Sequence, residues 1–298
     1  MERLCLGTVQ LGMHYGVHNA IGRQPTQKES FEILDLALAN NIKYLDTAAA
    51  YGSAEQILGE YNIAAKNVAI TTKLLPNVLD KHPEKKAIDI IEQEVTESLN
   101  KLKIKQLDGY LLHTPEYFYN KEVMFALQEI KKSSYVQNIG VSIYEEQHAV
   151  DVVKSGLCDY IQIPYSIFDQ RVNSTDFFAI AKEQGVKVFV RSAFLQGLIL
   201  MQENTIPRQL SMAIDYLKQL DKIIDKYNFT RLEAALLFSY QNVNIDKVVF
   251  GVETTKQLEE DLQIVNEMRD FSACKEELEY SFSGVPKSII FPSLWKKG

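Results

Sequence analysis

The feature that most constrains the fold of this 298-residue chain is a regular alternation of short aliphatic or β-branched runs with longer amphipathic segments. Such an alternation is typical of repeated strand–helix units, in which the strands run parallel. The expected strands cover residues 4–8, 43–46, 68–73, 107–113, 136–142, 160–164, 187–190 and 247–250. The expected helices cover residues 27–40, 54–62, 84–102, 121–133, 145–155, 174–184, 231–241 and 255–268. The chain is therefore predicted to be an α/β protein with eight such units.

Five of the expected helices begin with a Ser or Thr that is followed three residues later by Glu or Gln. In this capping box the two side chains satisfy free backbone amides of the first helical turn. The pairs are Thr26 with Glu29, Ser53 with Gln56, Ser142 with Glu145, Thr230 with Glu233, and Thr254 with Gln257. We expect a capped helix to begin at each of them.

Eight units can form either an open doubly wound sheet or a closed barrel. The Gly-rich turn G-x-G-x-x-G, expected after the first strand of a dinucleotide-binding open sheet, is absent. Barrels of about 250 residues commonly fold as one domain. We therefore predict a single (β/α)8 TIM barrel over residues 1–298, with an extra helical loop at 198–228 after strand seven. The tail, residues 271–298, is expected to pack near the active-site face.

Composition and charge favour small-molecule chemistry. The net charge is −7, and Lys and Arg adjoin only as pairs, which gives no basic patch for nucleic acid or an anionic membrane. The start of the chain lacks the features of a signal peptide, and no apolar run is long enough to span a membrane. We expect a cytoplasmic monomer or small homo-oligomer that binds neither nucleic acid nor membrane.

Cysteine and histidine spacing predicts neither disulfides nor a metal site. Cys5, Cys158 and Cys274 are odd in number and far apart, so we expect reduced, mostly buried thiols. His14 and His18 are four residues apart, but the glycines beside them argue against the helix that would align them as ligands. No metal is predicted.

Four polar residues lie at or just after the ends of neighbouring predicted strands. Asp46 and Tyr51 follow strand two, Lys73 ends strand three, and His113 ends strand four. The active site of a (β/α)8 barrel forms at the carboxyl ends of its strands. Each residue alone has an ordinary explanation, as a turn cap, a packed ring, a solvated cation or a satisfied core histidine. Their joint position predicts a catalytic group.

Several segments resemble the aldo-keto reductase family between Leu6 and about Met268. These segments are LGTVQLG, LDTAAAYGSAEQILGE, LLHT, NIGVSIY, IQIPYSIFDQR, SAFLQGLI and VVFGVETTKQLEED, each at a predicted strand end. The resemblance implies a catalytic tetrad of Asp46, Tyr51, Lys73 and His113, and an enzyme that reduces an aldehyde or ketone to the alcohol with NAD(P)H.

General acid chemistry explains why such a tetrad is needed. A carbonyl that accepts hydride at carbon must receive a proton at oxygen. We expect Tyr51 to supply the proton, Lys73 to lower the pKa of Tyr51, and Asp46 to hold Lys73 in place. His113 is expected to bind the substrate oxygen.

The resemblance also implies which residues hold a nicotinamide dinucleotide, since no side chain can donate hydride. Ser142 and Gln162 would hold the carboxamide, with Gly7, Thr8 and Asp46 near the adjoining ribose. The loop after strand seven would cover the pyrophosphate, and the segment after strand eight would receive the adenosine. These two segments contribute Ser192, Phe194, Gly197, Gly251, Thr254, Gln257, Glu260 and Asp261.

Two departures from the family pattern affect the nicotinamide end. Ile143 stands where the family usually has an asparagine that helps to hold the carboxamide. Arg191 stands where many members place an aromatic ring against the nicotinamide. A guanidinium can stack on a ring or bind a phosphate with two hydrogen bonds, so we expect Arg191 to contact the cofactor. The alternative is an outward-facing ion pair.

A third departure affects the adenosine end. Glu253, Gln257 and Asp261 occupy a segment where members that prefer NADPH place basic or neutral side chains, and Lys256 is the only cation nearby. Acidic neighbours repel the 2′-phosphate, which weakens or reverses a preference for NADPH. NADP is the cofactor expected from the family, with NAD as the alternative.

Substrate contacts are expected from Tyr15, His113 and Trp295. The polar and aromatic loops after strands one and four suit a hydroxylated, sugar-like carbonyl. A different class of function, a cofactor-binding sensor with little turnover like the potassium-channel β-subunits of similar fold, is compatible with the same tetrad. We expect an enzyme because the 298 residues hold no extra interaction domain.

Overall fold

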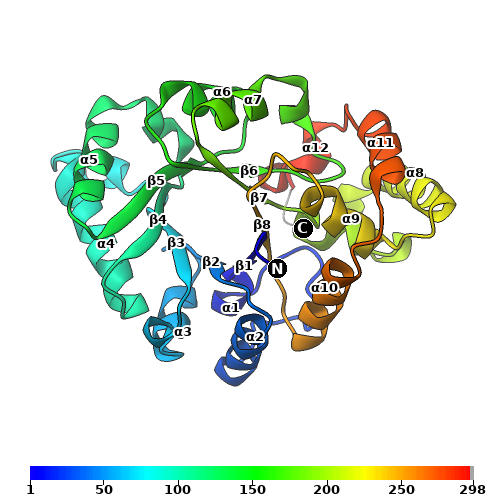
Figure 1. Cartoon of the computed structure of the whole chain (residues 1–298), viewed down its shortest axis with the longest axis horizontal. Helices are drawn as coiled ribbons and strands as arrows, with labels where there is room; N and C mark the ends of the chain where they lie inside the picture. Colours follow the sequence, from blue (N-terminus) through cyan, green and yellow to red (C-terminus); the bar gives the residue numbers. More distant parts are fainter. Residues whose placement is uncertain (296–298) are drawn as a thin grey trace.

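Eight parallel strands pair in chain order and close into a barrel in a computed structural model, which describes residues 1–295 (Figure 1). The strands are β1 (Leu4–Gly7), β2 (Tyr44–Asp46), β3 (Ala69–Lys73), β4 (Leu107–Leu112), β5 (Val136–Ser142), β6 (Tyr160–Pro164), β7 (Lys187–Arg191) and β8 (Lys247–Phe250). The predicted TIM barrel is confirmed.

A ring of helices surrounds the barrel (Figure 1). The repeating helices are α2 (Gln27–Ala39), α3 (Ala54–Glu60), α4 (Ala87–Leu102), α5 (Lys121–Lys132), α6 (Glu146–Ser155), α7 (Phe177–Glu183), α9 (Arg231–Tyr240) and α10 (Thr255–Glu267). Each begins and ends within three residues of its prediction. None of the helices within residues 1–295 is long and apolar enough to cross a membrane.

Three segments lie outside this repeat. A short helix, α1 (Val9–Gly12), follows β1 directly, and the predicted insertion after β7 contains α8 (Ala213–Lys226). The tail forms α11 (Ser272–Ser281) and α12 (Lys287–Ile290), and α11 packs against α8. The insertion and the first part of the tail therefore support each other.

The predicted capping boxes are confirmed at only two of five helices. Thr26 and Thr230 make complete boxes at α2 and α9, whereas Thr254 accepts the amide of Gln257 without the reciprocal bond. The boxes at Ser53 and Ser142 are wrong. Ser142 is the last residue of β5 and α6 begins only at Glu146, so its hydroxyl is directed to the barrel mouth and not to the helix.

Strand register positions the residues that matter for function. Gly7 pairs with Asp46, Asp46 with Thr71, and Ser142 with Gln162. Below them a separate apolar cluster made of strand residues fills the barrel, namely Cys5, Leu111, Tyr160, Phe189 and Val249. All three cysteines are free and buried, as predicted. The strand ends are therefore supported by a packed interior.

Candidate active site

A cavity of about 1250 Å³ opens at the carboxyl ends of the strands. Asp46 lines this cavity, and behind it the Lys73 ammonium lies 2.7 and 2.8 Å from the two Asp46 carboxylate oxygens and donates to the Thr47 carbonyl at 2.9 Å. Lys73 is 0 % exposed and Asp46 3 %. An ion pair this deeply buried is stable only when its hydrogen bonds are satisfied, and here they are.

A chain of hydrogen bonds extends from this ion pair across the barrel mouth. The Gln162 amide donates to Asp46 Oδ1 at 2.7 Å, and the Ser142 hydroxyl donates to the Gln162 carbonyl oxygen at 3.1 Å. Thr8 donates its hydroxyl to the Asp46 carbonyl at 3.1 Å. Strands β1, β2, β3, β5 and β6 thus hold one connected polar layer beneath the cavity.

Tyr51 lies above the Asp46–Lys73 pair. The Lys73 ammonium is 5.1 Å from the centre of the Tyr51 ring, and the His113 ring meets that ring edge-on at 6.1 Å. The backbone of Tyr51 passes so close to Gly12 that a Cβ at Gly12 would lie 1.8 Å from the Tyr51 carbonyl oxygen. Any larger residue at Gly12 would displace the turn that carries Tyr51.

The electrostatics of Tyr51 differ from the prediction. Burial raises the pKa of Tyr51 above its ordinary value, the negative charge of Asp46 raises it further, and the charge of Arg191 opposes this shift. The prediction that Lys73 lowers the pKa of Tyr51 is wrong, because the Asp46 carboxylate at 2.7 Å balances the positive charge of Lys73. Tyr51 therefore keeps its proton at neutral pH.

His113 is a neutral imidazole. Burial, with the charges of Lys73 and Arg191, lowers the pKa of His113 to about 3. Its Nδ1 is buried and has no hydrogen-bond partner within the described residues. The imidazole can thus offer a hydrogen bond to a neutral polar group in the cavity.

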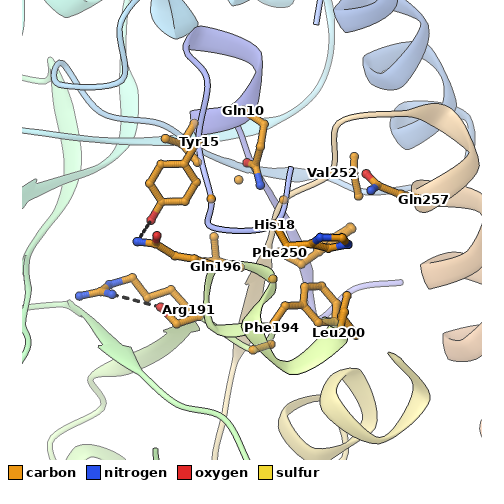
Figure 2. A pocket seen from close by; sticks show the side chains of 18 of the residues that line it. Gln10, Tyr15, His18, Arg191, Phe194, Gln196, Leu200, Phe250, Val252 and Gln257 are labelled. Carbon is orange, nitrogen blue, oxygen red and sulfur yellow. Dashed lines mark hydrogen bonds between the residues drawn. The ribbon is translucent and has the colours of Figure 1, made fainter. Parts of the chain in front are cut away.

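The loop after β7 forms another part of the cavity wall. Four of its residues have left-handed backbone angles, namely Ser192, Leu195, Gln196 and Gly197. The loop after β1 crosses to it, because the amides of Val17 and His18 donate to the Gln196 carbonyl at 3.0 and 3.3 Å. The Gln196 amide donates to the Tyr15 hydroxyl at 3.0 Å (Figure 2).

The end of the cavity near β8 is acidic. The Glu253 carboxylate is 7 % exposed and accepts hydrogen bonds from the Ala20 amide at 3.3 Å and the Gln257 side chain at 3.0 Å. Asp261 is 2 % exposed, and its Oδ1 lacks a partner among residues 1–295. Burial and the charge of Glu260 raise the pKa of Asp261. An unsatisfied buried acceptor of this kind can take a hydrogen bond from a ligand.

Within residues 1–295, Arg191 makes no ion pair. Its guanidinium donates to the Ile143 carbonyl at 3.0 Å and to the Ser192 hydroxyl at 3.2 Å, and its carbon lies 4.5 Å from the centre of the Tyr144 ring. The two family departures at Ile143 and Arg191 are therefore in direct contact. Arg191 and Tyr144 line one wall of the cavity, and Ile143 lies buried behind them.

Most of the residues predicted for the site line this cavity. They are Gly7, Tyr15, Asp46, Tyr51, His113, Ser142, Arg191, Ser192, Phe194, Gly197, Gly251, Gln257, Glu260 and Asp261. Thr8, Lys73 and Gln162 are buried beside Asp46 and reach the cavity through hydrogen bonds to it.

Two further predicted residues, Thr254 and Trp295, neither line the cavity nor contact Asp46. Thr254 caps α10, and the Trp295 indole donates to the Ile289 carbonyl at 3.2 Å within the tail. The tail instead contributes Pro292 and Ser293 to the cavity lining. Trp295 is a packing residue here because its one polar atom is already paired.

The lining also includes residues that the sequence did not predict for the site, among them Gln10, His18, Tyr144 and Gln196. Tyr144 follows β5 and Gln196 lies inside the loop after β7, so the rule that strand ends build the site could have found both. His18 lines the cavity only because the loop after β1 crosses to the loop after β7. No sequence signal marks that crossing.

No group of three or more His, Cys, Asp or Glu side chains within residues 1–295 could hold a metal ion. The arrangement provides instead a proton donor beside a buried cation, a neutral imidazole and an elongated cavity. Such a set can protonate a carbonyl oxygen while a bound group supplies hydride.

The model of the Aldo/keto reductase family matches residues 3–275. The chain belongs to this family of oxidoreductases. Among curated relatives, an NADH-specific methylglyoxal reductase of Escherichia coli is 25% identical over 299 residues, which cover 89% of this chain and 90% of the relative. An NAD/NADP-dependent indole-3-acetaldehyde reductase of Schizosaccharomyces pombe is 25% identical over 264 residues, covering 85% and 84% of the two chains.

Solved structures show the same fold. The holo form of aldo-keto reductase AKR11C1 from Bacillus halodurans has a TM-score of 0.76 at 21% identity, covering 99% of this chain and 95% of its own. The apo form of that protein has a TM-score of 0.72 at 21% identity, covering 96% and 95%. The sequence relatives named here are reductases, and the solved structures named here are aldo-keto reductases.

Proposed function

We propose that this aldo/keto reductase reduces an aldehyde or ketone to the alcohol with a reduced nicotinamide dinucleotide, and that Tyr51 is the proton donor. The observation that carries the proposal is the buried Asp46–Lys73 pair beneath Tyr51, with neutral His113 on the facing side. The two named relatives reduce aldehyde groups, which supports the substrate class.

The proton transfer follows from the charges around Tyr51. A donor must hold its proton before the reaction, and burial keeps Tyr51 protonated. When the phenol gives its proton to the substrate oxygen, the phenolate that remains lies beside the Lys73 ammonium. Asp46 fixes that ammonium with two hydrogen bonds, so little reorganisation accompanies the transfer.

Neutral His113 orients the substrate. An imidazole that stays uncharged can donate a hydrogen bond to the carbonyl oxygen without competing with Tyr51 as an acid. Tyr51 and His113 are neighbours in the cavity lining, with ring centres 6.1 Å apart, so one substrate oxygen placed between them can receive both hydrogen bonds. The carbonyl carbon is left to face the remaining wall of the cavity.

The residues of the cavity fit a nicotinamide dinucleotide. When bound, this cofactor supplies a hydride to the carbonyl carbon. Ser142 and Gln162 would hold the carboxamide, the Ser192–Gly197 loop the pyrophosphate, and the segment after β8 the adenosine. The unpartnered Asp261 Oδ1 and the amino end of α10, a 13-residue helix, support this placement.

We further propose that NADH is preferred over NADPH, although the family resemblance alone favours NADP. The Glu253 carboxylate lines the cavity and is held there by Ala20 and Gln257. Lys256, which the sequence offers as a counter-charge, has a side chain that is 83% exposed and lies 3.7 Å from Glu260, a second carboxylate of the cavity lining. A carboxylate accepts a hydrogen bond from a ribose 2′-hydroxyl and repels a 2′-phosphate.

Nicotinamide fluorescence measures this preference without turnover. We expect the Kd of NADH to be about tenfold or more below that of NADPH, since a single unscreened charge contact near the surface amounts to about 1–2 kcal/mol. Glu253→Gln should narrow the gap by lowering the Kd of NADPH. Glu259→Gln removes the same charge from an exposed site outside the cavity and should change neither value.

The activity itself is tested by the loss of NADH absorbance with methylglyoxal and with a neutral aromatic aldehyde. The proposal expects both to be reduced to alcohols. Tight binding of the dinucleotide without measurable reduction of any aldehyde would contradict an enzymatic role. It would favour the sensor that the sequence leaves open as the alternative.

A further inference from the structure

One arginine in the cavity lining makes no salt bridge with a carboxylate of residues 1–295. Two arginines line the cavity, and Arg231 pairs with Asp221 through Nη2 and Oδ2 at 2.6 Å. Arg191 has no carboxylate within 4.0 Å anywhere in residues 1–295. Its guanidinium is therefore partly buried without a direct counter-ion. Its charge acts on Asp169 at longer range, and a carboxylate on a ligand would supply the missing direct partner.

Arg191 also keeps free hydrogen-bond donors. A guanidinium has five N–H groups, and Arg191 uses one toward the Ile143 carbonyl and one toward the Ser192 hydroxyl. Tyr144 covers one face of the guanidinium and so restricts its rotation. The remaining donors are held in place at the cavity wall, and a planar fork of this kind matches the geometry of a carboxylate.

A second donor lies on the same side of the cavity. The Tyr15 hydroxyl accepts a hydrogen bond from Gln196, which leaves its own proton available, and Figure 2 shows Gln196 between Tyr15 and Arg191. The positive charge of Arg191 contributes to the pKa of Tyr15, Tyr51 and His113. It opposes the rise that burial causes in the two tyrosines and adds to the lowering in His113. Arg191 is thus close to the point of proton transfer and not only to the adenosine end.

We propose that Arg191, assisted by the Tyr15 hydroxyl, binds a carboxylate on the substrate, so that the preferred substrates are aldehydes or ketones that also carry an acid group. This inference rests on the proposed carbonyl reduction and adds the substrate class to it. The sequence predicts a cofactor contact for Arg191, and the two roles have different consequences that an experiment can separate.

The experiment compares acids with their methyl esters. The pairs are 4-oxobutanoate with methyl 4-oxobutanoate, and 4-formylbenzoate with methyl 4-formylbenzoate. In each pair the reacting aldehyde group is the same, and a neutral methyl ester replaces the negatively charged carboxylate. We expect kcat/KM to be about 10- to 100-fold higher for the acid of at least one pair, mainly through KM, since hydrogen bonds to charged groups are the strong ones.

Two Arg191 variants and a control variant test whether the preference for acids over esters depends on Arg191. Arg191→Gln should bring the acid-to-ester ratio of kcat/KM close to one, mainly by lowering kcat/KM for the acid, and a circular dichroism spectrum like that of the parent shows that the variant folds. Arg191→Lys keeps the charge without the fork and should keep part of the preference. Arg208→Ala removes the same charge from an exposed position outside the cavity and should leave all values unchanged.

A binding measurement separates this inference from the proposed function. Calorimetry on the NADH-loaded protein should show benzoate binding at least tenfold more tightly than benzamide, with the difference lost in Arg191→Gln. If this holds while no aldehyde is reduced, the carboxylate site stands and the proposed function fails. The inference is overturned if benzoate and benzamide bind alike and acids show no advantage over esters. It is also overturned if Arg191→Gln weakens NADH binding and slows acid and ester equally, because Arg191 then serves the cofactor.

Discussion

The two halves of the cavity are built in different ways. The proton-transfer half consists of side chains from the ends of β2, β3 and β4, and its charges are paired within the protein, as Lys73 is with Asp46. The half assigned to the dinucleotide consists of loops after β1, β7 and β8, with left-handed residues in the β7 loop and an unpartnered carboxylate oxygen at Asp261. The charges of the first half are balanced within the protein, whereas the second half contains a buried carboxylate oxygen that a ligand would satisfy.

The strongest way to break this contrast is to remove the lysine of the proton-transfer half. Lys73→Met leaves the Asp46 carboxylate buried without its partner, so the free energy of unfolding in urea should fall by about 3–5 kcal/mol and reduction should nearly cease. Adding Asp46→Asn should restore part of the stability, because no buried charge remains. Lys131→Met breaks a half-exposed pair with Asp159 and should cost only about 0–1 kcal/mol. Equal losses for Lys73→Met and Lys131→Met would mean that the Asp46–Lys73 pair is not buried as described.

A substitution in the β7 loop should affect the other half with a smaller effect on stability. Gly197 has a φ of +89°, and a Cβ there would lie 2.8 Å from His18 Cβ. Gly197→Ala should therefore separate the β1 and β7 loops, raise the Kd of NADH by about tenfold, and lower stability by about 1–2 kcal/mol. Gly185→Ala is the matched control, since Gly185 has a φ of +68° with nothing within 4 Å of its Cβ. It should show a similar backbone cost and an unchanged Kd.

The smallest effect is expected in the pH dependence of kcat/KM, which should show no titration of His113 or Tyr51 near neutral pH. With the pKa of His113 near 3 and that of Tyr51 above its ordinary value, kcat/KM for a neutral aldehyde should be flat between about pH 5 and 8. An inflection near the ordinary histidine pKa that disappears in His113→Asn would show that His113 carries charge during the reaction.

The protonation of His113 should also change the free energy of unfolding with pH. The unfolded chain takes up a proton on His113 near pH 6.5, whereas the folded chain does so only near 3. The free energy of unfolding should therefore decrease as the pH falls from about 6.5 towards 3. The difference between the parent and His113→Asn in urea titrations isolates this contribution.

The proton-transfer half could be predicted from the sequence because strand order in a barrel is spatial order. Asp46, Lys73 and His113 end or follow consecutive strands, so the closed topology brings them together without further information. The charge balance was harder to predict, because the expected lowering of the Tyr51 pKa ignored the two hydrogen bonds that bind Lys73 to Asp46.

The loop half could be predicted only in part. Arg191 and Glu253 were singled out as departures from the family pattern. The crossing of the β1 loop to Gln196 depends on backbone hydrogen bonds that no residue type predicts. Ser142 shows the same limit, since its spacing to Glu145 fits a helix cap while the fold uses its hydroxyl for Gln162. Trp295 was expected in the cavity because the family resemblance implies a tail that folds over the pocket, yet its hydrogen bond to Ile289 holds it in the tail.

The central claim is that Tyr51 gives the proton when a carbonyl is reduced. The most direct test is the single-turnover rate of a neutral aldehyde with NADH already bound, in the parent, in Tyr51→Phe and in Tyr280→Phe, which removes a hydroxyl from a residue 87% exposed. The account predicts an unchanged Kd for NADH in all three, an unchanged rate for Tyr280→Phe, and a rate about 10²- to 10⁴-fold lower for Tyr51→Phe. A Tyr51→Phe protein that binds NADH normally and reduces the aldehyde at the parent rate would contradict it.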